Sequence, residues 1–202
     1  MDNATFYLLM RDLLSFPSRA LAESVRDGSL ARALQDARPD VAGDPSLVAL
    51  SDPTLTDAAL EALYIALFDG AGPARACPLY TGVFARSRRD AMEELARFYR
   101  HFSVTSDTDA RDLPDSVPTV LEFLGLLAEG ERAASGSARG AFRAARRDVL
   151  ERHLVPWCRE ASARLGAAES SPLYASAIAL LELVARRDLA ALDAVYASAA
   201  SR

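Results

Sequence analysis

The sequence contains no lysine, because all 23 basic residues of the 202-residue chain are arginine. A Schiff-base lysine, a phosphate-loop lysine and a lysine general base are therefore excluded. Cysteine and histidine are scarce, with two of each. Cys77 and Cys158 stand far apart, and no HExxH or paired CxxC spacing occurs. The sequence thus indicates neither a disulfide framework nor a zinc site.

Long hydrophobic runs are also missing. The N-terminal stretch MDNATFYLLMRDLLSF is interrupted by Arg11 and Asp12, which is not typical of a signal peptide. Nothing approaches the roughly 20 apolar residues that a membrane span requires. The formal charge of −5 gives no general attraction to nucleic acid. We therefore expect a cytoplasmic protein that has no membrane span and does not bind nucleic acid.

Composition and periodicity favour helices. Half of the residues are apolar and a quarter are charged, as in globular proteins. An apolar stripe with helical spacing follows the predicted cap Thr56, and it consists of Leu60, Leu63, Tyr64, Leu67 and Phe68. We find no alternating strand pattern longer than four residues. The sequence predicts an all-α fold, a single globular bundle of about 8–10 helices. Its N-terminal helices would occupy 1–102, a hinge loop 103–114 and the C-terminal helices 115–202.

Helix boundaries follow from capping and breaking residues. Ser18 is expected to cap one short helix, which Gly28 would end. Pro156 is expected to disturb the turn that precedes it, because proline lacks the N–H of a helical hydrogen bond. Asp188 is expected to begin the last helix.

An acid stands inside the most apolar predicted helix. Glu122 lies among leucine, valine and phenylalanine side chains, so we expect it at a groove edge, paired with an arginine or capping another helix. The alternatives left open are an internal ion pair and contact with a cationic ligand. Asp112 and Asp115 precede the same helix. They would either cap it or present carboxylates at the mouth of a loop.

The segment CPLYTGVF carries two aromatic residues, Tyr80 and Phe84, four positions apart. They would fold back onto the core or form a wall of an apolar groove. Cys77 is expected to be structural, since no activating histidine adjoins it in the sequence. His153 and Trp157 are one helical turn apart and are expected to pack together or to form a seam between surface and core.

The order of several short motifs resembles the TorD/DmsD/NarJ family, which are cytoplasmic chaperones of molybdenum-containing oxidoreductases. The motifs are YIALFDG, CPLYTGVF, FYRHF, DLPDSVPTVLEFLGLLAEGE and HLVPWCREASARL followed by SPLYASAIALLEL. The resemblance implies an all-helical chaperone without cofactor, metal or catalytic residues. It also implies a partner, the catalytic subunit of a molybdoenzyme or its twin-arginine leader. The branch serving dimethylsulfide-, ethylbenzene- or selenate-type enzymes is the most similar.

The resemblance and the acids together predict a client-binding surface. Its residues are Tyr64, Leu67, Phe68, Pro78, Tyr80, Phe84, Asp112, Asp115, Ser116 and Glu122. Ser116 departs from the family, many of whose members have histidine there. Because a leader offers guanidinium groups and then an apolar stretch, its receptor needs carboxylates beside apolar walls. We expect the protein to be a monomer or a swapped dimer.

Two other functions remain open at this level. A helical small-molecule-binding or sensor domain would show a closed pocket of about 300–1,000 Å³ in the same apolar groove. An enzyme would use Cys77 or His153, although the sequence contains no recognisable pair of nucleophile and base.

Overall fold

The computed structural model describes residues 1–69, 77–104, 113–167 and 172–200. These ranges form the helices α1 (Asn3–Leu13), α2 (Arg19–Arg26), α3 (Ser29–Ala37), α4 (Pro45–Ala49), α5 (Asp57–Tyr64), α6 (Arg88–His101), α7 (Val117–Ala133), α8 (Gly136–Val149), α9 (Val155–Ala167) and α10 (Pro172–Ala200). Short 3-10 turns cover Pro39–Val41 and Thr81–Phe84, and π turns cover Ile65–Asp69 and Leu150–Leu154. Within these ranges no strand forms beyond the isolated bridge between Tyr80 and Ser116. The predicted all-α fold is confirmed.

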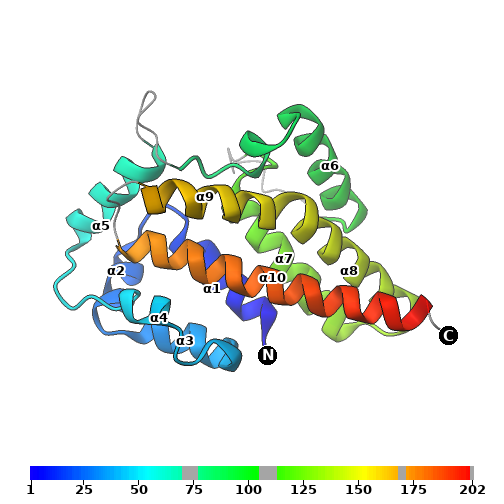
Figure 1. The fold of residues 1–202 in the computed structure, drawn as a ribbon, viewed down its shortest axis with the longest axis horizontal. Helices are drawn as coiled ribbons and strands as arrows, with labels where there is room; N and C mark the ends of the chain where they lie inside the picture. The colour runs from blue at the N-terminus through cyan, green and yellow to red at the C-terminus, as the bar shows by residue number, and fades with distance from the viewer. Residues whose placement is uncertain (70–76, 105–112, 168–171, 201–202) are drawn as a thin grey trace.

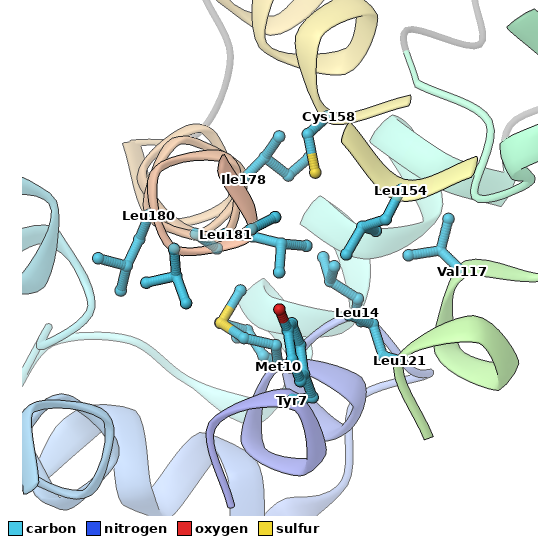
Figure 2. Packing of buried hydrophobic residues seen from close by; sticks show 14 of the residues in the cluster. Tyr7, Met10, Leu14, Val117, Leu121, Leu154, Cys158, Ile178, Leu180 and Leu181 are labelled. Atoms are coloured by element: carbon cyan, nitrogen blue, oxygen red, sulfur yellow. The ribbon is translucent and has the colours of Figure 1, made fainter. Parts of the chain in front are cut away.

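One hydrophobic core joins the two ends of the chain. Helix α1 packs along α7, and α9 lies beside α10 (Figure 1). Figure 2 shows the core where Met10, Leu121 and Ile178 converge from α1, α7 and α10. The core therefore includes residues from both sides of the predicted hinge. Most of that hinge, 105–112, lies outside the described residues. In the part of the chain that the structure describes, no helix is long and apolar enough to cross a membrane.

Local capping follows the sequence closely. The Ser18 hydroxyl accepts a hydrogen bond from the Leu21 N–H at 3.1 Å, and Thr56 does the same for Ala59 at 3.1 Å. These bonds satisfy N–H groups that have no partner inside the helix. The expected disturbance before Pro156 is also confirmed, because the π turn Leu150–Leu154 separates α8 from α9 there.

The expected helix start at Asp188 is wrong. Helix α10 continues through this residue, whose side chain is buried. Its carboxylate accepts hydrogen bonds from the Tyr7 hydroxyl at 2.8 Å, Asn3 Nδ2 at 3.0 Å and Arg146 Nη2 at 3.1 Å. These distant donors satisfy the hydrogen-bonding capacity of the carboxylate, so Asp188 does not have to cap the N-terminus of a helix. We call Asn3, Tyr7, Glu131, Arg146 and Asp188 the Asp188 cluster, since Glu131 also pairs with Arg146.

Candidate functional site

The structure brings two of the predicted site segments together. The Thr81 N–H donates to the Asp115 carbonyl at 2.8 Å, and the Val117 N–H donates to the Leu79 carbonyl at 3.0 Å. The 77–84 segment is therefore hydrogen-bonded to the chain that leads into α7. From its other side, Trp157 Nε1 donates to the Pro78 carbonyl at 3.0 Å. Trp157 thus holds this segment in place.

Asp115 forms an internal ion pair beneath the 77–84 segment. Its side chain is 0% exposed, and Oδ2 accepts from Arg88 Nε at 2.8 Å while Oδ1 accepts from Arg88 Nη2 at 3.3 Å. The hydrogen bond to Asp115 raises the pKa of Arg88. Ser116 is the N-cap residue of α7, with no side-chain capping bond. The interpretation of Asp115 as a helix cap is therefore wrong, because Arg88 takes up its carboxylate oxygens.

Arginine side chains also cover both aromatic rings of the segment. The Arg88 guanidinium carbon lies 4.7 Å from the centre of the Tyr80 ring, and that of Arg164 lies 4.6 Å from the centre of the Phe84 ring. Both distances allow cation–π attraction. We call Tyr80, Gly82, Arg88 and Asp115 the Asp115 site.

Gly82 is required for the seating of this ion pair. A Cβ atom at Gly82 would lie 2.8 Å from Asp115 Oδ2 and 2.9 Å from Arg88 Cγ. Such contacts are shorter than van der Waals distances, so any larger residue would push the pair apart. No sequence pattern indicates this contact, since the partner Arg88 lies 27 residues before Asp115.

The first predicted element, around Tyr64, forms an aromatic cluster. The Tyr64 ring centre lies 5.1 Å from that of Phe68, and Phe68 lies 4.9 Å from Tyr174. Leu67 and Phe68 are buried, so they support this surface from within. Tyr64 is partly exposed, and its ring meets that of Phe16 at 5.6 Å.

Beside Tyr64 lies an exposed surface that the sequence did not predict. Phe16 is 58% exposed and Ile65 is 45% exposed. Glu61 and Asp69 are exposed four residues before and after Ile65, and neither forms an ion pair with another described residue. We call Phe16, Glu61, Tyr64, Ile65 and Asp69 the α5 face. Ile65 falls outside the apolar stripe of its helix, and this was the signal available in the sequence.

Glu122 lies in a different environment from Asp115. The Glu122 side chain is 61% exposed, and its Oε1 lies 3.5 Å from Arg11 Nη1, which makes a weak surface pair. Glu122 therefore needs no internal partner, although its neighbours in the sequence are apolar. Asp112 lies outside the described residues. Contact of Asp112, Ser116 and Glu122 with a client stays a prediction.

The candidate nucleophile Cys77 and the candidate base His153 are both buried. Burial raises the pKa of the Cys77 thiol to about 12, so the reactive thiolate is scarce. His153 is buried, which lowers its pKa, and its Nε2 lies 3.3 Å from Glu94 Oε2. The His153 ring thus lies beside Glu94 of α6, while the Trp157 indole bonds to Pro78. Among the described residues no group of three or more His, Cys, Asp or Glu could hold a metal ion.

Two surface hollows lie away from the predicted site. One of about 620 Å³ is lined by the start of α1, the end of α7 and α8. Another of about 520 Å³ lies between α6 and α8. Neither is lined by Tyr64, Tyr80 or Phe84, so neither supports a small-molecule sensor that uses the predicted groove.

Comparison with known proteins gives a consistent result. A family model described as the nitrate reductase delta subunit matches residues 19–163. The selenate reductase assembly chaperone protein of Thauera selenatis is 39% identical over 158 residues, which cover 74% of this chain and 80% of that protein. The chlorate reductase assembly chaperone protein of Ideonella dechloratans is 37% identical over 155 residues, which cover 74% of this chain and 80% of that protein.

The fold has a counterpart among solved structures. A crystal structure of a candidate redox enzyme maturation protein from Archaeoglobus fulgidus matches 96% of this chain and 94% of its own, with a TM-score of 0.51 and 15% identity. At that identity the likeness supports the fold alone. The relation that the sequence motifs indicated is confirmed by the family model and the two chaperones. The chain belongs to the nitrate reductase delta subunit family.

Proposed function

We propose that this chain is a dedicated assembly chaperone. It binds the catalytic subunit of a molybdenum-containing oxidoreductase in the cytoplasm, holds it during cofactor insertion and before export, and performs no covalent chemistry. The observation that carries this proposal is the similarity to two assembly chaperones over 80% of their own length. Burial raises the pKa of the Cys77 thiol to about 12, which argues against a nucleophilic role for this residue.

The α5 face is the docking surface for an arginine-bearing leader segment. It combines exposed apolar area on Phe16 and Ile65 with the carboxylates of Glu61 and Asp69. A leader that carries guanidinium groups and then an apolar stretch needs this combination. The Asp115 site offers a second contact, although its carboxylate now binds Arg88.

Co-expression tests the chaperone function. The chain is produced with the molybdopterin-binding catalytic subunit from its own genome, and the cofactor content of that subunit is measured with and without the chain. We expect the two proteins to purify together and the cofactor content to fall when the chain is left out. Equal cofactor content without co-purification would contradict the proposal.

Titration with a synthetic twin-arginine leader peptide tests the α5 face. Glu61→Gln combined with Asp69→Asn should weaken binding, and the weakening should shrink as salt is raised. Asp36→Asn is the matched control, because Asp36 is an exposed acid on α3. If Asp36→Asn weakened binding as much as the double variant does, the peptide would bind away from the α5 face.

A further inference from the structure

The Asp115 site is already occupied by a guanidinium group of the chain itself. Arg88 forms two hydrogen bonds with the Asp115 carboxylate and stacks on the Tyr80 ring. A planar guanidinium between a carboxylate and an aromatic face has the geometry in which arginine is recognised. The site is thus built for an arginine side chain.

The position of Arg88 makes this occupancy reversible. Its side chain is 41% exposed, whereas that of Asp115 is completely buried beneath it. Arg88 is the first residue of α6, and it follows the exposed residues Ala85 and Arg86. Its side chain can therefore turn away without breaking the helix, which opens a path from solvent to Asp115.

We propose that Arg88 is an internal stand-in for an arginine of the client, which displaces it from Asp115 and Tyr80 on binding. This inference rests on the proposed function and assigns a ligand chemistry to the Asp115 site. In the free chaperone Arg88 keeps the buried carboxylate neutralised. In the complex the client guanidinium takes over the same hydrogen bonds, and Arg88 points into solvent.

The exchange selects arginine over lysine. A client lysine would restore the charge but could not make the paired, planar contact with both oxygens while stacking on Tyr80. Arg164 on Phe84 provides a contrast, because it is exposed and forms no ion pair with a described carboxylate. Displacing it would give the client no ion pair.

Removing the stand-in should strengthen client binding. In Arg88→Gln the client arginine no longer has to displace a competitor, so a twin-arginine leader peptide should bind about tenfold more tightly than to the wild type. The gain should vanish when both peptide arginines are replaced by lysine, and also in the double variant Arg88→Gln with Asp115→Asn. Arg164→Gln, the matched control, should leave the affinity nearly unchanged.

Stability gives a second measurement on the same variant. Millimolar guanidinium chloride should raise the thermal midpoint of Arg88→Gln, while the same concentration of ammonium chloride should not. If Arg88→Gln fails to fold, Arg88→Lys replaces it, and a smaller gain in peptide affinity is expected. A folded variant that binds the peptide no more tightly than the wild type would overturn the exchange.

The outcomes separate this inference from the proposed function. If the catalytic subunit purifies with the wild type but Arg88→Gln leaves the peptide affinity unchanged, the arginine exchange is contradicted and the chaperone function stands. If guanidinium raises the thermal midpoint of Arg88→Gln but the wild type binds no client, the guanidinium site stands and the chaperone function is contradicted.

Discussion

Asp188 and Asp115 are both buried aspartates paired with an arginine, yet their surroundings differ. Asp188 accepts from Tyr7, Asn3 and Arg146, and the side chain of Arg146 is itself buried. Asp115 has one side-chain partner, Arg88, which lies at the start of α6 and reaches solvent. Helix α6 stands at the edge of the bundle in Figure 1. The first ion pair is locked by its neighbours, and the second can open.

The difference shows how one pairing chemistry serves two purposes. Surrounded by several donors, a buried carboxylate fixes the relative position of α1, α8 and α10. A buried carboxylate whose single partner is a half-exposed arginine can instead bind a guanidinium group from another molecule. Variants of the two regions should therefore differ in the size of their effects on stability.

The largest effect is expected at the Asp188 cluster. Asp188→Leu leaves the Tyr7 hydroxyl and part of the Arg146 guanidinium buried without a partner, which should lower the free energy of unfolding by about 3–5 kcal/mol. Urea unfolding monitored by circular dichroism measures this loss of stability. Asp193→Leu, which removes a half-exposed surface ion pair with Arg147 from the same helix, is the control and should change stability by less than about 1 kcal/mol. Equal losses would show that the Asp188 cluster has no special role.

Gly82→Ala should have the next largest effect. The added Cβ collides with Asp115 and Arg88, and overpacking of this kind costs about 1–3 kcal/mol. The change should also weaken binding of an arginine-bearing peptide. Gly140→Ala is the control, since nothing lies within 4 Å of a Cβ there. It should stabilise α8 slightly, because alanine favours the helix. A Gly82→Ala protein with unchanged stability and unchanged peptide affinity would contradict the close contact of Gly82 with Asp115 and Arg88.

A smaller, pH-dependent effect is expected at His153, next to the Asp115 site. Burial lowers its pKa below the ordinary 6.5, so the folded state binds fewer protons than the unfolded state as pH falls past that value. The contribution of neutral His153 is therefore present above pH 6.5 and is lost on acidification. His153→Gln should flatten the pH dependence of the unfolding midpoint between pH 7 and 5, whereas His101→Gln should not.

The smallest effect is expected at Glu122. Its pair with Arg11 is long and exposed, so Glu122→Gln should change the free energy of unfolding by less than about 1 kcal/mol. A chemical denaturation curve is sufficient to measure it. A loss as large as that of Asp188→Leu would mean that Glu122 has an internal partner after all.

Local signals predicted much of the fold. Ser18 and Thr56 marked helix starts and Pro156 marked a distorted turn, because each acts on backbone groups a few residues away. The errors concerned carboxylates with distant partners. Asp188 bonds to Tyr7, 181 positions away, and Asp115 bonds to Arg88, 27 positions away. No spacing rule connects such residues, so Asp188 was interpreted as a helix start, and Asp115 as either a helix cap or a carboxylate at the mouth of a loop.

The candidate site shows the same contrast between local and distant signals, and its contact with a client stays a prediction. Tyr80 and Asp115 were found through motifs, and the structure brings them together. The exposed residues of the α5 face were missed, because the apolar stripe shows which side of a helix is exposed but not which exposed residues form a binding surface. Ile65 lies on that exposed side.

The single tryptophan is well placed to report on these events. The indole of Trp157 is buried and bonded to Pro78, in the segment that carries Tyr80. Any shift of that segment alters the polarity around the ring, and intrinsic fluorescence is sensitive to such a change. The native chain thus carries its own optical probe of client capture, with no dye attached.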